Sequence, residues 1–166
     1  MASVTINKYL QDLAAKKPVP GGGSSAALVG ALGVALIEKA CNFTIGKEKF
    51  KAVEKDMRQI LKKAIGARKR LVKLVELDKQ AFLPVAKAYK LPRETDEQKA
   101  ARKERIALAL KEASRVPAEI KRICNGLLEG CDRLEKDGNQ LLVGDVRCAR
   151  ELLKAAGKGA ENFIQA

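Results

Sequence analysis

Hydrophobic residues recur along most of this chain at three- and four-residue intervals, which is the spacing of one face of an α-helix. The first such segment covers residues 3–15, and a nearly uncharged second segment covers residues 24–45. A third segment runs over residues 48–90 and contains Pro84, where a bend is expected. The pattern therefore predicts three successive helices in the first 90 residues.

The second half of the chain predicts one long helix and a shorter final one. Thr95 and Gln98 form a capping box that starts the long helix after a proline-containing break. Apolar positions then alternate at spacings of four and three, and Pro117 lies on this stripe, where it should kink the helix. Residues 137–139 end it, and Asp145 is expected to cap a last helix that runs to about residue 164. The stripe consists of Ile106, Leu110, Ala113, Pro117, Ile120, Cys124, Leu127, Cys131 and Leu134.

These segments predict an all-α bundle of about five helices, two of them long and antiparallel, in a single domain over residues 1–166. The composition agrees, because tryptophan is absent and aromatic residues make up 4%, so that the core must be aliphatic and rich in alanine. Ala27, Ala31 and Ala35 form a smooth strip on the second helix. Such a strip lets helices approach closely, so we expect this helix to be central and the protein to dimerise.

The net charge of +13 implies an acidic partner or a lysine-rich solvated surface. Basic residues are spread over every polar helix face and aromatic residues for base stacking are scarce, so nucleic acid is not the favoured partner. The uncharged run over residues 18–37 leaves about 14 helical residues, short of the roughly 20 that span a bilayer. No signal peptide is visible, and we expect a cytoplasmic protein without membrane association.

The chain has no histidine, and its four cysteines show no CxxC spacing. The cysteines therefore lack the spacing of a zinc motif and have no histidine to complete a site, and a Ser-His-Asp or Cys-His triad is excluded by residue type. Cys124 and Cys131 lie seven residues apart on the apolar stripe and are expected to be small core residues. Any chemistry must use carboxylates, lysines, hydroxyls or thiols, and no metal is expected.

The most distinctive segment is Pro18-Val19-Pro20-Gly21-Gly22-Gly23-Ser24-Ser25, directly before the uncharged helix. The glycines allow a turn and the paired serines are expected to cap the helix. A glycine-rich turn at a helix N-terminus exposes backbone N–H groups and the positive end of the helix dipole, which suits an anionic or carbonyl-bearing ligand. On this segment alone, a loop that merely starts a buried helix is the simpler interpretation.

The wider sequence is more specific. It contains, in order, PVPGGGSSAALVGALGVALIEKACNFTIGKEKF, LVELDKQAF, AYKLPRETDEQKAARKERI, EASRVPAEI and GNQLLVGDVRCARELLKAAGKGAENF. Together these segments resemble the formiminotransferase-cyclodeaminase C-terminal family, whose stand-alone bacterial members include methenyltetrahydrofolate cyclohydrolases. Two features depart from the family: Gly144 precedes Asp145 where a serine is usual, and the family usually continues beyond residue 166. The resemblance implies one-carbon folate metabolism and a homodimer with active sites near the subunit boundary.

The resemblance implies one of two reactions. The first is hydrolysis of 5,10-methenyltetrahydrofolate to 10-formyltetrahydrofolate, and the second closes 5-formiminotetrahydrofolate to the methenyl compound with release of ammonia. A free-standing chain, without a transferase domain to hand over the formimino group, favours the cyclohydrolase. The substrate would be a folate with a glutamate or polyglutamate tail, with no further cofactor. A basic, non-catalytic helical adaptor for RNA or another acidic partner is the alternative of a different class.

Asp78 is the expected catalytic carboxylate, because it falls within the apolar stripe of the third helix between Leu74 and Phe82. Burial raises the pKa of a carboxyl group toward the range useful for proton transfer. The alternative is a structural carboxylate satisfied by a neighbouring helix or by Arg102. The family resemblance makes Asp145 a second candidate for the catalytic carboxylate. The alternative interpretation is that Asp145 only caps the N-terminus of the last helix.

The glycine turn is expected to hold the ligand through backbone N–H groups. If the two long helices are antiparallel, Arg102 lies about 9 Å along the helix axis from the level of Asp78. We therefore expect its guanidinium to reach an anionic group of a ligand bound beside Asp78. The alternative interpretation is that Arg102 is a solvated charge near the start of a helix. Asn42 and Thr44 match an Asn-Leu-Thr of the family and would hold a pterin edge or only satisfy a helix end. The expected substrate-binding residues are Gly21, Gly22, Gly23, Ser24, Asn42, Thr44, Lys47 and Arg102.

Overall fold

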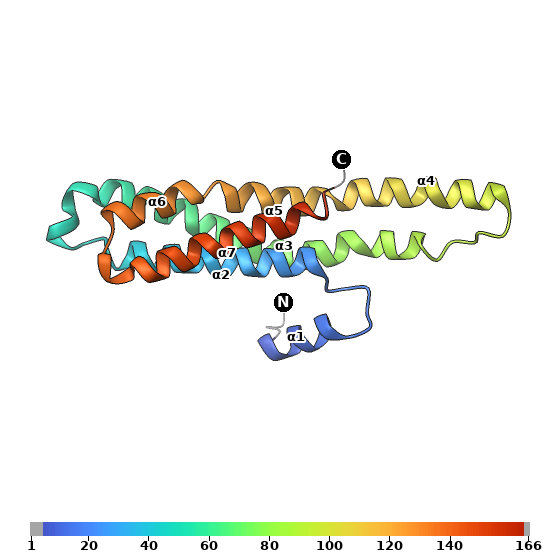
Figure 1. Ribbon diagram of the computed structural model, residues 1–166, viewed down its shortest axis with the longest axis horizontal. Coiled ribbons are helices and arrows are strands. Elements are labelled where there is room, and N and C mark those ends of the chain that lie inside the picture. Colours follow the sequence, from blue (N-terminus) through green and yellow to red (C-terminus); the bar gives the residue numbers. More distant parts are fainter. Residues whose placement is uncertain (1–4, 165–166) are drawn as a thin grey trace.

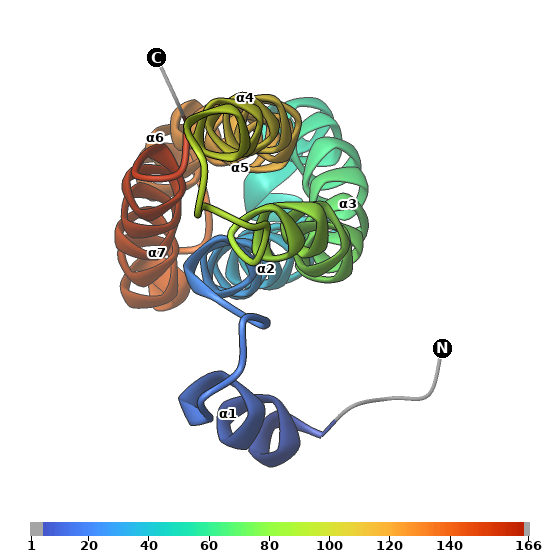
Figure 2. The same ribbon diagram turned by 90° about the vertical axis from the view of Figure 1, so that its right-hand side faces the viewer.

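The computed structural model describes residues 5–164, and over that range the protein is an all-α bundle without strands, as predicted. In the end view, α2, α3, the row α4–α6 and α7 surround a common core (Figure 2). α3 runs antiparallel to the row formed by α4, α5 and α6, which confirms the two long antiparallel stretches (Figure 1). The elements are α1 Ile6–Ala14, α2 Gly22–Asn42, the 3-10 helix η1 Glu48–Val53, α3 Glu54–Ala88, α4 Asp96–Ala113, α5 Arg115–Asn125, α6 Leu128–Asp137, the 3-10 helix η2 Gln140–Leu142 and α7 Val143–Glu161.

Helix α2 packs along α3 and α7 and also touches α5 and α6. Its glycines allow this close packing: a Cβ at Gly30 would lie 2.9 Å from the sulfur of Cys124, and one at Gly33 would lie 3.0 Å from the carbonyl oxygen of Ala149. The smooth strip therefore packs mainly inside the protomer, while Ala35 at its end is exposed. Cys41, Cys124 and Cys131 are buried, which confirms Cys124 and Cys131 as core residues.

Two expectations about α2 are wrong. The paired serines do not cap it: its N-cap is Gly21, which makes no side-chain capping bond, and both serines lie inside the first turns. The second expectation was that the uncharged run leaves about 14 helical residues, too few to span a bilayer. The helix continues past Glu38 and Lys39 to Asn42, so it is 21 residues long and is long and apolar enough to cross a membrane by length and composition. However, 56% of its most apolar window is buried within the bundle, which is the burial pattern of a core helix.

The long helix predicted after Thr95 is divided into α4, α5 and α6, which follow one another along one side of the bundle (Figure 1). The first break lies at Ser114, three residues before Pro117, because proline has no N–H to bond the helix turn that precedes it. A second break at Gly126–Leu127 was not expected. The capping box of Thr95 and Gln98 is confirmed. From Pro117 onward every position of the apolar stripe is buried.

Helix α1 stands apart from the bundle in both views (Figures 1 and 2). Tyr9 is its one buried residue in the described range. The apolar face expected for this helix includes Ile6 and Leu10, which are 75% and 51% exposed. Residues 3 and 4 of the predicted first helix lie outside the described residues. This helix is therefore attached to the bundle chiefly through a single side chain.

Candidate active site

A pocket of about 240 Å³ opens where the N-terminus of α2 meets the C-terminal half of α3. The two strongest predicted features, the glycine turn and Asp78, meet in this pocket. Among residues 5–164, Asp78 is the only ionisable residue that lines it, and the surrounding surface is mostly apolar. The lining consists of Pro18, Val19, Gly21, Gly22, Gly23, Asp78, Phe82, Leu110, Ala113, Pro117, Asn162 and Phe163.

The carboxylate of Asp78 lies directly against the backbone of Gly23. A Cβ at Gly23 would come within 2.7 Å of the Asp78 carboxyl carbon, so only glycine leaves room for this contact. Burial raises the pKa of Asp78 above its ordinary value of 3.8, and a hydrogen bond from the backbone N–H of Ser24 opposes that rise by favouring the charged form. The site thus combines a partly desolvated carboxylate with the first N–H groups of a helix.

None of the three glycines of the turn has a positive φ; in the described chain only Gly46 does. Gly22 and Gly23 are instead needed for close approach, whereas a Cβ at Gly21 would meet nothing within 4 Å. Gly22 faces Phe163, whose ring carbon Cε2 would lie 2.8 Å from an added Cβ. The hydroxyl of Ser24 is completely buried and lies 2.9 Å from the hydroxyl oxygen of Tyr9. Ser24 therefore faces Asp78 with its backbone N–H, while its side-chain hydroxyl contacts Tyr9.

Three predicted binding residues lie at the opposite end of α2. Asn42 is 19 residues from Gly23, which corresponds to about 28 Å along the helix. Thr44 is buried, donates a hydrogen bond to the carbonyl oxygen of Ala40 at 2.7 Å and accepts one from the backbone N–H of Asn139 at 3.1 Å. Lys47 is exposed. Within one protomer the structure does not bring these residues to the pocket of Asp78.

Asp145 is also distant from that pocket. It does not cap α7, because the helix begins earlier, at Val143 after η2, and its N-cap is Leu142. The Asp145 carboxylate instead pairs with the ammonium of Lys39 at 2.7 Å. Lys39 lies 16 residues from Gly23 on α2, or about 24 Å along the axis. The two candidate carboxylates are therefore separate within one protomer.

The expectation that Arg102 reaches the space beside Asp78 is wrong for a single protomer. Its guanidinium donates to the carbonyl oxygen of Tyr89 at 3.1 Å and lies over the Tyr89 ring. Tyr89 is 11 residues beyond Asp78, or about 16 Å along α3. The register differs from the expected one, so that Leu110 and Ala113 face the pocket. Arg102 consequently gives Asp78 no structural partner.

Sequence reasoning missed several pocket residues. Leu110, Ala113 and Pro117 were assigned to the bundle stripe, and the structure shows that this end of the stripe borders the pocket. Asn162 and Phe163 come after the last full turn of α7, and only the tertiary fold brings them to the glycine turn. Their one sequence signal is the GAENF segment of the family resemblance.

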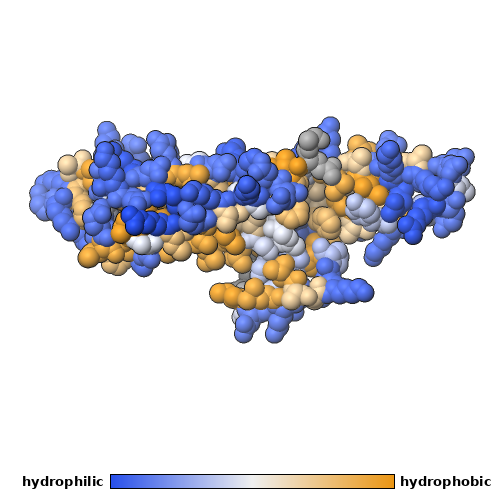
Figure 3. Space-filling model, viewed as in Figure 1, coloured by the Kyte–Doolittle hydropathy of each residue, from blue (hydrophilic) through white to orange (hydrophobic). Residues whose placement is uncertain are grey.

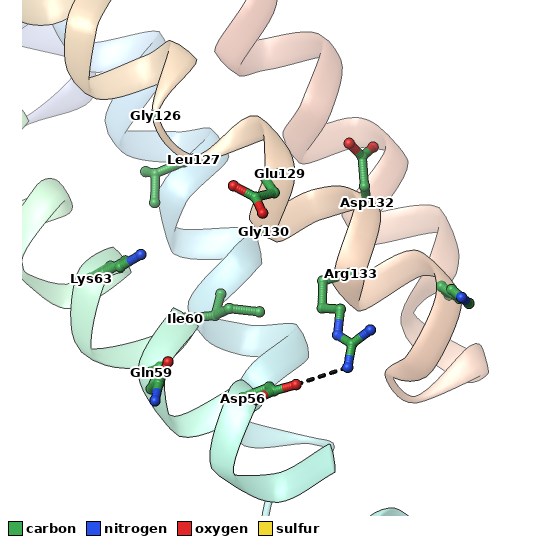
Figure 4. A pocket seen from close by; sticks show the side chains of 11 residues that line it. Asp56, Gln59, Ile60, Lys63, Gly126, Leu127, Glu129, Gly130, Asp132 and Arg133 are labelled. Carbon is green, nitrogen blue, oxygen red and sulfur yellow. Dashed lines mark hydrogen bonds and ion pairs between the residues drawn. The ribbon is translucent and has the colours of Figure 1, made fainter.

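A larger hollow of about 390 Å³ lies between the start of α3 and the break before α6. Figure 4 shows that the ion pair of Arg133 with Asp56 crosses it, with a separation of 2.8 Å. Lys63, Glu129 and Asp132 also border this hollow, so that acidic and basic groups alternate around it. None of the predicted catalytic or binding residues lies here.

Replacing Asp78 by Asn should stabilise the fold at neutral pH. A carboxyl group whose pKa is raised by folding binds its proton more tightly in the folded protein, so the free energy of unfolding falls as the pH rises above the ordinary value of 3.8. An amide has no charge to desolvate and escapes this loss. We expect Asp78→Asn to melt a few degrees above the wild type at neutral pH, with the difference shrinking toward about pH 3. Thermal denaturation over this pH range measures it, and a less stable variant at neutral pH would contradict the assigned direction.

Comparison with known proteins agrees with the geometry. Residues 5–166 match the family model described as formiminotransferase-cyclodeaminase. A methenyltetrahydrofolate cyclohydrolase of Methylorubrum extorquens is 42% identical over 145 residues, covering 87% of this chain and 70% of the relative. The formimidoyltransferase-cyclodeaminase of Rattus norvegicus is 29% identical over 160 residues, and this chain spans 30% of its length.

A solved structure gives the same result for the fold. The crystal structure of a formiminotetrahydrofolate cyclodeaminase from Thermotoga maritima superposes with a TM-score of 0.84 at 31% identity, over 97% of this chain and 76% of the other. The glycine turn, the carboxylate beside it and these matches over nearly the full length lead to one assignment. This chain belongs to the formiminotransferase-cyclodeaminase family.

Proposed function

We propose that this protein is an enzyme of folate one-carbon metabolism that hydrolyses 5,10-methenyltetrahydrofolate to 10-formyltetrahydrofolate. The observation that carries the proposal is the Asp78 carboxylate, which lies against the Gly23 backbone at the start of α2 in a pocket where the described part of the chain supplies no other ionisable lining group. The methenyl bridge carries a positive charge, which a carboxylate in an apolar pocket attracts. The identity of 42% to a named cyclohydrolase, against 29% to the rat formimidoyltransferase-cyclodeaminase, favours hydrolysis.

The proposed reaction needs one proton-transferring group and no metal. Water attacks the bridge carbon between N5 and N10 and gives up a proton to Asp78, forming a neutral tetrahedral adduct. The bond from the bridge carbon to N5 then breaks, and the proton held by Asp78 passes to N5. A second proton leaves the adduct hydroxyl for solvent as the formyl group forms on N10. The raised pKa of Asp78 suits a group that must both accept and return a proton.

Closure of 5-formiminotetrahydrofolate is the second candidate reaction. It is favoured by the solved relative from Thermotoga maritima, which is named as a formiminotetrahydrofolate cyclodeaminase. Here N10 attacks the formimino carbon and gives up its proton to Asp78, which passes that proton to the formimino nitrogen. The same nitrogen gains a second proton, drawn from solvent through Asp78, and leaves as ammonia when its bond to the carbon breaks, which forms the methenyl cation. The same carboxylate could move both protons, so the pocket by itself supports either reaction.

Following the methenyl absorbance with each substrate distinguishes the two reactions. A cyclohydrolase consumes the absorbance of added methenyltetrahydrofolate faster than buffer alone, whereas a cyclodeaminase creates it from the formimino compound. Activity with neither substrate would reject the enzyme proposal. Stabilisation against heat by folate, compared with salt-sensitive retention of RNA, then tests the RNA-adaptor alternative, because a ligand that binds only the folded state raises the melting temperature.

We also propose that the working form is a cytoplasmic homodimer that binds a polyglutamylated folate. The pocket volume of about 240 Å³ is below the usual ~300–1,000 Å³ of small-molecule sites, so one protomer encloses only part of the substrate. Apolar side chains are also exposed: Leu32 on α2 is 53% exposed, and Ile6 of α1 is 75% exposed. Figure 3 shows hydrophobic residues along the edge of the bundle nearest α1 and on α1 itself. Light scattering tests this proposal, and a monomer at the concentration of the activity assay would reject it.

A further inference from the structure

Tyr9 connects α1 to the candidate active site. It is 8% exposed, while its neighbours Ile6 and Leu10 on the same helix are exposed. Its hydroxyl oxygen lies 2.9 Å from the Ser24 hydroxyl and 3.4 Å from the Ser25 hydroxyl. Because α1 otherwise stands apart from the bundle, this hydroxyl is its main polar link to the start of α2 (Figure 2).

The bonds continue from the serines into the glycine turn. The Ser25 hydroxyl donates to the carbonyl oxygen of Gly21 at 2.9 Å. Within the described chain, the completely buried Ser24 hydroxyl has Tyr9 as its hydrogen-bond partner and no other. One tyrosine hydroxyl therefore contacts two adjacent serines, one of which holds the first residue of the turn.

The same short segment faces the carboxylate. The backbone of Gly23 contacts the Asp78 carboxylate, and the adjacent backbone N–H of Ser24 acts to lower the pKa of that carboxylate. A shift of the Ser24 backbone would therefore change both the position of the carboxylate and the direction of the N–H groups exposed to a ligand. We propose that Tyr9 is a positioning residue, whose hydroxyl fixes residues 21–25 against Asp78 so that carboxylate and bound substrate keep one relative orientation. The expected effect of Tyr9 on turnover rests on the proposed folate chemistry, whereas the expected ordering of residues 21–25 by Tyr9 does not.

The ring of Tyr9 has a separate role, which the test must leave intact. The ammonium of Lys79 lies 5.8 Å from the centre of the ring and pairs with Glu76 at 3.0 Å. Tyr9→Phe keeps the ring and its cation–π contact and removes only the hydroxyl. Tyr89→Phe is the matched control, because Tyr89 is the only other tyrosine, is 51% exposed and makes no side-chain hydrogen bond in the described structure.

The kinetic test compares these variants well below their melting temperatures. We expect Tyr9→Phe to lower kcat about five- to tenfold with a smaller change in KM, while Tyr89→Phe stays at the wild-type value. The double variant Tyr9→Phe with Ser24→Ala removes both partners of the buried bond, so it should recover thermal stability without recovering kcat. A kcat of Tyr9→Phe within twofold of wild type, or a double variant that regains kcat together with stability, would overturn the proposal.

Hydrogen exchange of the backbone amides separates this inference from the proposed function. Tyr9→Phe should speed exchange at residues 22–25, and Tyr89→Phe should not. If the wild type proves inactive on both folates, the enzyme proposal fails while exchange still reports whether Tyr9 orders the turn. Unchanged exchange at residues 22–25 would overturn the positioning role whatever the activity. If Tyr9→Phe alone does not fold, the double variant supplies both measurements.

Discussion

Asp78→Asn is expected to lower turnover by about 10²–10⁴-fold while leaving the fold intact. The amide retains the size of the carboxylate and an oxygen that accepts the Ser24 N–H bond, but it cannot take a proton from water or return one to nitrogen. Of the residues that the structure describes in one protomer, no other ionisable side chain lines the pocket, so none of them replaces the lost group. Initial rates on methenyltetrahydrofolate at saturating substrate measure the effect.

Two controls make this result specific. Asp132→Asn is the same chemical change on α6, where the carboxylate is exposed and pairs with Arg150 at 2.8 Å, and it should keep full activity. The second control is the stability of Asp78→Asn itself, which should rise at neutral pH while turnover falls. Opposite changes in activity and stability exclude unfolding as the cause. Near-full activity of Asp78→Asn would reject the assignment and make Asp145 the next carboxylate to replace.

The positions of the helices were largely predictable from the sequence, because each helix follows from the spacing of apolar residues that are close together in the chain. Apolar periodicity located the bundle helices, and the capping box at Thr95 marked the start of α4. Asp78 was recognisable for the same reason, since a carboxylate inside an apolar stripe is costly unless it has a role. The break at Gly126–Leu127 was not predictable, because the apolar spacing continues through it and the buried Leu127 keeps its place in the core.

What the sequence could not supply was register between distant elements. The level of Arg102 relative to Asp78 depends on how the connection between α3 and α4 is folded, and a shift of a few residues moved it out of reach. Phe163 reaches Gly22 because α7 packs along α2, a contact that no spacing rule encodes. Asn42 and Asp145 match or approach family motifs, yet within one protomer they lie at the far end of α2. The proposed homodimer is the arrangement in which these residues would serve a shared site.

Gly23→Ala should reduce activity by about 10²-fold without lowering stability. An added Cβ would overlap the Asp78 carboxyl group, and the flexible end of that side chain must move because the helix backbone cannot. A displacement of about 1 Å at a reacting group is enough for a loss of this size. Alanine is meanwhile the better helix former by roughly 1 kcal/mol, which offsets the strain of moving one carboxylate.

Gly66→Ala provides the comparison for that prediction. Gly66 lies in the interior of α3, and a Cβ there would meet nothing within 4 Å, so the same substitution should raise the melting temperature and leave the kinetics unchanged. Rates and thermal denaturation of both variants at one pH give the measurement. If the loss of activity in Gly23→Ala matched the fraction of protein that is unfolded, Gly23 would be needed only for packing of the fold. If it kept wild-type kcat, contact between the Gly23 backbone and the Asp78 carboxylate would not be part of the chemistry.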